Sequence, residues 1–253
     1  MPCFVPFNGK KMDLSFFVFR HVGVFAEELI EALKFFSFFC EDLGCIYSAT
    51  FKSIHGNMIV WYGAWVKRPD AQRRLLIDHL ISVLEKVSHL AVLLDHGFFE
   101  SYVGESKDGR SALRFVTGDT VSMAAMTPIS GDPENLSYAC MALLKSYYLQ
   151  EDGVAGGACF SCLDKPMVAS MQVWKSLHDC YAWLINSDYR TNIRPYLSHL
   201  ANDCEYEVFN VVFVSSDELL PVQLLPSPAK MIDHSSIEGE DEMGGMEQAE
   251  SSS

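Results

Sequence analysis

The sequence predicts an α+β protein folded as a two-layer α/β sandwich, with a ferredoxin-like βαββαβ unit in its N-terminal half. Between Leu14 and Asp95, apolar runs rich in β-branched and aromatic residues alternate with segments of helical periodicity, in the order strand, helix, strand, strand, helix, strand. This order packs two helices on one face of an antiparallel sheet. Hydrophobic residues make up 49% of the chain, which is enough for a sizeable core.

The first strand and helix are marked by their spacing. Leu14 to Phe19 is an apolar run rich in phenylalanine, as strands often are. From Phe25 to Leu43, apolar side chains recur at three- and four-residue steps, and three glutamates fall in the early turns. Negative charge there suits the helix dipole, and Gly44 is expected to end the helix.

A hairpin and a second helix complete the N-terminal unit. Strands are expected over Cys45 to Ser53 and Met58 to Val66, joined through Gly56 and its neighbours, which tolerate a tight turn. Asp70 to Val87 has the apolar spacing of a helix. Leu90 to Leu94 is short and wholly apolar, which favours a buried strand, although it could also extend the helix.

The second half is less regular. We expect a short helix over 98–106, a strand over 120–126, a helix over 133–147 and a glycine-rich loop over 153–157. A strand over 168–174 should follow, then a long helix from 177 that breaks at Pro195, and final strands over 206–214 and 219–225. Strand, helix, strand, strand therefore recurs from Val168. A second βαββ layer and two unrelated uses of a common motif are equally good interpretations.

Residues 1–225 are expected to form a single globular domain, with two sub-modules (1–126 and 132–225) as the alternative. Residues 226–253 carry seven acidic residues, one basic residue (Lys230) and almost no large apolar side chains. Such a segment cannot bury enough apolar surface to fold, so a disordered acidic tail is predicted.

Charge and cysteine usage exclude several classes of function. The net charge of −14 disfavours binding to nucleic acids or to an anionic membrane surface. No run of about 20 uncharged apolar residues suggests a spanning helix. The N-terminus lacks a secretory signal, and most of the eight cysteines fall in apolar periodic segments, as reduced core residues do. We therefore expect a cytoplasmic or nuclear protein that is not secreted.

Three groups of residues are candidate sites. Cys159 and Cys162 have the spacing of half a zinc site, but no second pair exists, so two ordinary thiols are the preferred interpretation. Trp61 and Trp65 share one strand face and could line a pocket or a contact surface, although burial beneath helices is the commoner outcome. Asp95-His96 ends a predicted strand without a nucleophile motif, which favours a loop histidine beside a capping carboxylate.

Two resemblances add to these observations. Gly23-Val24-Phe25-Ala26-Glu27 after a first strand resembles the amino-acid-sensing ACT domains, in which ligands bind near the first strand-to-helix turn. That resemblance implies a ligand site at His21, Val22, Gly23 and Val24. The phrases 4–8, 51–58, 61–65 and 186–190 resemble a plant-specific family with a domain of unknown function, which implies a plant source and an intracellular context.

The absence of convergent reactive groups predicts a non-enzymatic interaction or scaffold module that needs no cofactor and binds an unidentified protein partner. The alternative function is an ACT-like sensor of amino acids.

Overall fold

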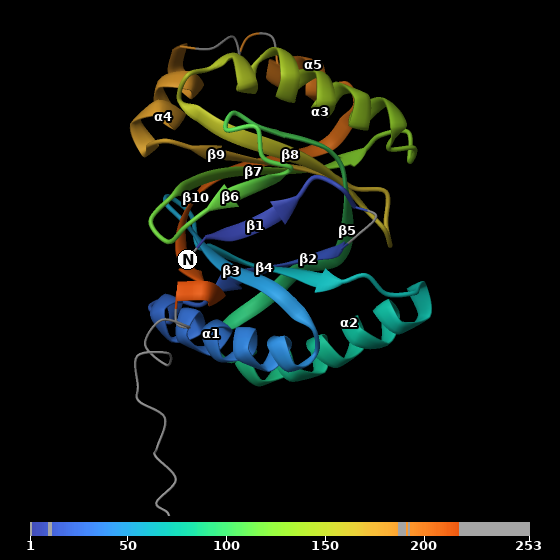
Figure 1. Cartoon of the computed structure of the whole chain (residues 1–253), viewed down its shortest axis with the longest axis vertical. Helices are drawn as coiled ribbons and strands as arrows, with labels where there is room; N and C mark the ends of the chain where they lie inside the picture. The colour runs from blue at the N-terminus through green and yellow to red at the C-terminus, as the bar shows by residue number, and fades with distance from the viewer. Residues whose placement is uncertain (1, 10–11, 187–190, 192, 218–253) are drawn as a thin grey trace, which may run out of the picture.

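The computed structural model describes residues 2–217 except 10–11, 187–190 and 192. Its centre is a closed barrel of antiparallel strands (Figure 1). The barrel strands are β2 (Met12–His21), β3 (Cys45–Ser53), β4 (Met58–Val66), β5 (Ala91–Ser106), β7 (Thr120–Pro128), β8 (Val154–Cys162), β9 (Val168–Trp174) and β10 (Ala201–Val214). Around the barrel they follow the order β10-β3-β4-β2-β5-β8-β9-β7.

The predicted two-layer sandwich is wrong, because the sheet closes on itself. Pairing runs β5-β2-β4-β3 in the first half and β8-β9-β7-β10 in the second. A sandwich would leave strands at the edges, but here β5 pairs with β8 and β3 pairs with β10. Closure leaves no strand edge of the barrel unpaired, which removes the usual template for edge-to-edge association.

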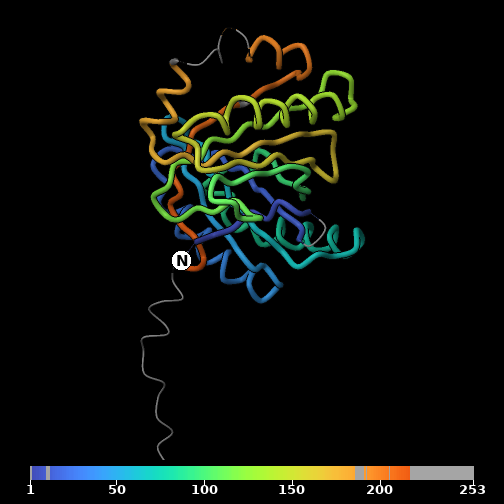
Figure 2. Tube along the Cα trace, turned by 45° about the horizontal axis from the view of Figure 1, so that its top comes forward, coloured from blue at the N-terminus to red at the C-terminus, as the bar shows by residue number. Residues whose placement is uncertain are grey.

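Two helical layers cover opposite sides of the barrel (Figures 1 and 2). The helices α1 (Ala26–Asp42) and α2 (Asp70–Leu84) pack on the first half, and α3 (Glu134–Ser146), α4 (Leu177–Asn186) and α5 (Arg194–Ser198) pack on the second. Short 3₁₀ turns follow at 85–87, 148–150 and 215–217. Strand β2 is therefore buried on both faces: Phe16 faces the barrel interior, and Phe17 faces α1.

A small sheet inside the barrel fills part of its interior. Strand β1 (Cys3–Pro6) pairs with β6 (Ala112–Phe115), and their side chains join the interior core that contains Leu14 and Phe51. The barrel wall accommodates this insert closely, since a Cβ at Gly104 would lie 2.0 Å from the Phe7 ring. Neither strand is predicted from the sequence, because four residues are too few to establish a periodicity.

The structure confirms the predicted helices near 25–43, 70–87 and 133–147, and the strands over 14–19, 45–53, 58–66, 120–126, 168–174 and 206–214. The helix expected over 98–106 and the loop expected over 153–157 are wrong. Both segments are strand, and they pair with each other as β5 and β8. The second βαββ order also begins earlier than predicted, at β7 rather than at Val168.

Other predictions concern residues that are not described or properties that the fold does not test. The strand expected over 219–225 and the acidic tail over 226–253 lie outside the described residues. One barrel includes strands of both proposed sub-modules, and the division at 126–132 stays a prediction.

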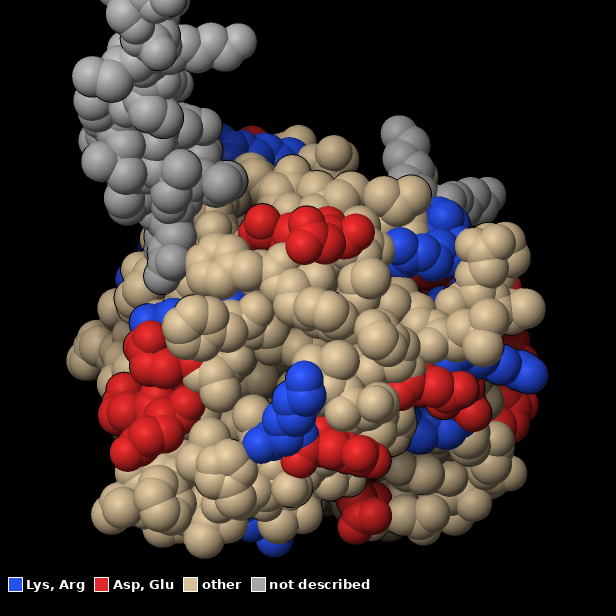
Figure 3. All heavy atoms as spheres, turned by 90° about the horizontal axis from the view of Figure 1, so that it is seen from below, with Lys and Arg blue, Asp and Glu red and all other residues tan. Residues whose placement is uncertain are grey.

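The outer side of α1 and α2 carries both acidic and basic side chains (Figure 3), and most exposed positions of α1 are acidic: Glu27, Glu28, Glu31, Glu41 and Asp42. Phe35 on this side of the molecule is 72% exposed, and Phe38 is also exposed. Exposed apolar side chains are found where proteins contact other molecules. No partner is identified by this surface, and the expected protein partner stays a prediction. No helix in the described part of the chain is long and apolar enough to cross a membrane.

Candidate functional site

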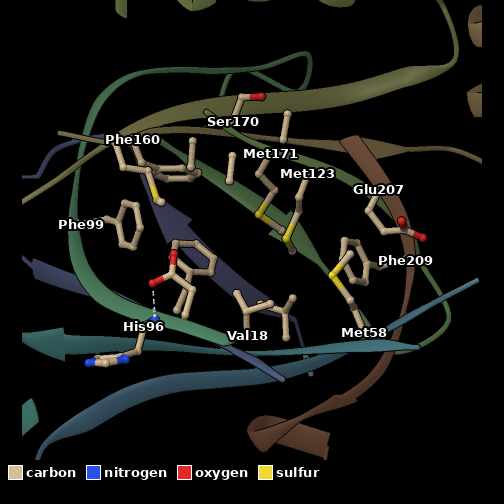
Figure 4. Close-up of a pocket in the computed structure, with 17 residues that line it drawn as sticks. Val18, Met58, His96, Phe99, Met123, Phe160, Ser170, Met171, Glu207 and Phe209 are labelled. Atoms are coloured by element: carbon tan, nitrogen blue, oxygen red, sulfur yellow. Dashed lines mark hydrogen bonds between the residues drawn. The ribbon is translucent and has the colours of Figure 1, made fainter. Parts of the chain in front are cut away.

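The barrel interior contains a cavity of about 90 Å³ (Figure 4). Its lining is mostly apolar. The large apolar residues are four phenylalanines and four methionines: Phe16, Phe99, Phe160, Phe209, Met58, Met123, Met167 and Met171. Small antiparallel barrels are either filled by side chains or hold one small ligand, and this barrel is filled at one part and hollow at another.

Strand register decides which side chains reach the cavity. On β2 and β5, Val18 pairs with Asp95 and Phe17 pairs with His96. Paired residues share a face of the sheet, so Asp95 faces the interior with Val18. The His96 ring points away from the cavity (Figure 4) and stacks on Phe17 with centroids 6.0 Å apart. Asp95 and His96, expected at the end of a strand with the histidine in a loop, both lie within β5, and only the aspartate presents its side chain to the cavity.

Asp95 is held in place by two contacts. The Lys165 ammonium, from the turn between β8 and β9, forms an ion pair with Asp95 Oδ1. The backbone N–H of His96 donates a hydrogen bond of 2.7 Å to the same oxygen. Among the described residues both contacts involve Oδ1, which leaves Oδ2 available to a molecule in the cavity. The two contacts therefore orient the carboxylate and leave its second oxygen to a molecule in the cavity.

A second carboxylate, Glu207, reaches the cavity from β10, where its cross-strand partner is Met123. The Ser53 hydroxyl donates a hydrogen bond of 2.5 Å to Glu207 Oε1 and accepts one of 2.7 Å from the backbone N–H of Gly56. In the described part of the chain no lysine or arginine forms an ion pair with Glu207. The Ser53 hydrogen bond therefore fixes the position of Oε1 without a paired cation among the described residues.

The turn predicted to bind a ligand lies elsewhere. His21 to Val24 connect β2 to α1, and none of these residues lines the cavity. Val22 is 48% exposed and Val24 84% exposed, and Gly23 adopts a positive φ of 54°. The turn is an exposed connection between a strand and a helix. Its role in ligand binding stays a prediction.

The predicted tryptophan pair lies in the core beneath α1. Trp61 and Trp65 are both fully buried, and neither lines the cavity. Each indole N–H has a partner: Trp61 donates to the Ser37 hydroxyl at 2.9 Å, and Trp65 donates to the Ser15 hydroxyl at 2.8 Å. Both side chains fill space between the barrel wall and the helices.

The two cysteines with zinc-like spacing lie on β8 and point in different directions. The Cys159 thiol packs toward α3, where Sγ lies 3.7 Å from the Cys140 carbonyl oxygen. Cys162 lies at the end of β8, where a Cβ on Gly97 would lie 3.2 Å from its sulfur. Burial raises the pKa of both thiols, which keeps them protonated near neutral pH. No cluster of three or more metal-binding side chains occurs within the described residues.

One protein-family model matches part of the chain, and no activity is assigned to that family. Residues 97–209 match the model of a domain of unknown function (DUF7392). This match confirms the resemblance to a family with a domain of unknown function, while the plant source stays a prediction. The comparison with curated proteins finds no match.

Solved structures share the barrel at low sequence identity. An anthrone oxidase-like protein aligns with a TM-score of 0.66 and 12% identity, covering 83% of this chain and 95% of that protein. A proposed monooxygenase of Fusobacterium nucleatum has a TM-score of 0.57 and 7% identity, covering 81% and 94%. A proposed monooxygenase of Lactobacillus acidophilus NCFM has a TM-score of 0.52 and 12% identity, covering 81% and 96%.

These findings correct the predicted function. The non-enzymatic scaffold was inferred from an absence of convergent groups, but the barrel holds a cavity with two carboxylates and is shared with proteins described as oxidase-like or as monooxygenases. The ACT-like sensor is not supported either. The outer strands of the first half, β5 and β3, are paired within the chain. A site across an interface between open sheets therefore cannot form at those edges.

Proposed function

We propose that the protein binds a small aromatic molecule inside the barrel and acts on it as an oxidase or monooxygenase, with Asp95 as the general base. The observation that carries this proposal is the apolar cavity in the barrel with an oriented carboxylate on its wall. Apolar cavities with few, well-placed polar groups are the usual form of small-molecule sites. The oxidase-like and monooxygenase descriptions of structures with the same barrel support the reaction class.

The lining explains how a cavity of about 90 Å³ could accept an aromatic ring. A cavity of about 150 Å³ admits benzene, so this one must widen when a ligand enters. Methionine side chains are unbranched and have three rotatable bonds, which lets them move aside at little cost. Met58, Met123, Met167 and Met171 line the cavity, and favourable contacts between sulfur and a ring would stabilise the complex.

The chemistry begins with proton transfer. The free oxygen of Asp95 would accept a proton from an acidic C–H or O–H group of the bound molecule. The resulting anion is electron-rich and can react with molecular oxygen. For anthrone the overall reaction is balanced as anthrone plus O₂ giving anthraquinone plus water. The apolar lining would exclude bulk water from the anion.

Oxygen uptake with anthrone as the probe tests the proposal. We expect the purified protein to accelerate oxygen consumption above the uncatalysed rate, with anthraquinone formed in equal amount to the oxygen consumed. Binding is measured separately with the neutral fluorescent probe N-phenyl-1-naphthylamine. A protein that neither enhances the fluorescence of this probe nor consumes oxygen with anthrone would contradict the proposed function.

Filling the cavity should prevent binding. Ala169 lines the cavity on β9, and Ala169→Leu adds three carbon atoms at this position. We expect at least a tenfold weaker affinity for N-phenyl-1-naphthylamine, since the ligand and the new side chain compete for the same volume. Fluorescence titration gives the affinity, and circular dichroism checks that the variant is folded.

The matched control is Ala71→Leu, because Ala71 is an exposed alanine on α2. It should leave probe affinity unchanged. Equal affinities for the wild type and a folded Ala169→Leu variant would mean that the probe binds outside the barrel.

A further inference from the structure

The cavity has a carboxylate on each of two opposite walls, and we infer that it selects aromatic molecules with a hydrogen-bond donor at each end and rejects anions. The inference rests on the proposed function and specifies the class of molecule that the same site accepts. Asp95 on β5 and Glu207 on β10 are the two carboxylates that line the cavity.

Their opposition follows from the strand order. In the closed order β10-β3-β4-β2-β5-β8-β9-β7, strands β5 and β10 are four positions apart in either direction. They are therefore diametrically opposite in the barrel. Each is also the last strand of its half, following the second helical segment of a strand-helix-strand-strand-helix-strand order. The two carboxylates thus occupy equivalent strands of the two halves.

Register directs both side chains inward. Asp95 pairs with Val18, and Glu207 pairs with Met123, and both partners line the cavity. The rest of the lining is mostly rings and thioethers, with Phe99, Met123 and Phe209 among them (Figure 4). A molecule that spans the cavity therefore meets an acceptor at each end and apolar surface along its length.

The charges at the two ends determine which end groups fit. Lys165 compensates the charge of Asp95, whereas no described cation is paired with Glu207. The effect of Glu207 extends to the neighbouring Tyr181, whose pKa is raised by burial, by Cys180 and by the Glu207 carboxylate. An anionic end group would bring like charges together in an apolar cavity, which is strongly unfavourable. Hydroxyl or amino groups instead satisfy the carboxylate oxygens.

A matched series of naphthalenes tests the inference by displacement of N-phenyl-1-naphthylamine at pH 7. We expect 2,6-dihydroxynaphthalene to bind at least about tenfold more tightly than 2-naphthol, because a site built to receive a donor discriminates against an analogue that lacks it. 6-Amino-2-naphthol should bind like the diol, which tests whether either kind of donor is accepted. 2-Naphthoic acid should not displace the probe.

Two variants of Glu207 separate hydrogen bonding from charge. Glu207→Leu removes the acceptor and should abolish the preference for the diol over 2-naphthol. Glu207→Gln keeps an acceptor but removes the charge, so it should allow 2-naphthoic acid to bind. Glu105→Gln and Glu105→Leu are the controls, because Glu105 is exposed and does not line the cavity. They should behave as the wild type does.

The outcomes distinguish this inference from the function on which it rests. If 2-naphthol displaces the probe but the diol binds no more tightly, the inference is wrong and the aromatic site remains. Continued rejection of 2-naphthoic acid by a folded Glu207→Gln variant would also overturn it. If no naphthalene displaces the probe and anthrone is not oxidised, both the inference and the proposed function fail.

Discussion

Replacing Asp95 with asparagine should slow oxygen uptake with anthrone by about 100- to 10,000-fold, the range typical for loss of a general base. Asparagine has nearly the same shape, and its amide oxygen can still accept the hydrogen bond from the His96 backbone N–H. It cannot take up a proton near neutral pH. Affinity for N-phenyl-1-naphthylamine should change by less than about threefold, because the cavity keeps its volume.

Asp164→Asn is the matched control for this experiment. Asp164 lies in the same β8–β9 turn as Lys165 but is exposed and does not line the cavity. Its substitution should leave both oxygen uptake and probe affinity at wild-type values. Full activity of a folded Asp95→Asn variant would remove Asp95 from the role of base, whatever the protein binds.

Replacing Asp13 with alanine should lower the free energy of unfolding by about 3 kcal/mol, as expected when one partner of a buried ion pair is removed. Asp13 is only 1% exposed. The Lys67 ammonium lies 3.0 Å and Arg73 Nη1 lies 3.6 Å from Oδ1, and the backbone N–H of Arg68 donates a hydrogen bond of 2.9 Å to Oδ2. These contacts join the start of β2 to the segment that leads from β4 into α2.

Urea denaturation followed by circular dichroism measures the effect. The control is Glu31→Ala, which removes an exposed carboxylate paired with Lys34 on α1 and should cost less than about 1 kcal/mol. Equal destabilisation by the two substitutions would show that burial of the Asp13 network contributes little. Asp13 does not line the cavity, so probe binding by the folded fraction should be unchanged.

Local sequence patterns were sufficient to predict most helices and six of the eight barrel strands. The helical spacing from Phe25 to Leu43 reflects a stripe that packs on the barrel, and α1 covers Ala26–Asp42. The errors fall at 98–106 and 153–157, where strands are formed by long-range pairing of β5 with β8. Glycines 156 and 157 resemble a loop in sequence. In the barrel a Cβ at Gly157 would lie 2.6 Å from Leu144 Cδ1, so close packing accounts for the lack of a side chain.

The site was only partly predictable. Asp95 could be singled out because a charged residue follows an apolar strand, but the sequence does not reveal whether Asp95 or His96 faces inward. Apolar residues on both faces of β2 remove the alternation that normally separates core from solvent. The sequence does not single out Glu207, because it is one of three acidic residues within 202–207 and nothing in the pattern shows which of them reaches a cavity.

The sequence by itself determined the identity and order of most local elements, because helix periodicity and strand composition arise from residues that are neighbours in the chain. Tertiary structure alone decided that the sheet closes into a barrel. It also decided that β1 and β6 enter the interior, and that Asp95 and Glu207 line one cavity from opposite strands. The physical reason is that closure depends on register between strands far apart in sequence, and a shift of one residue in that register would turn both carboxylates out of the cavity.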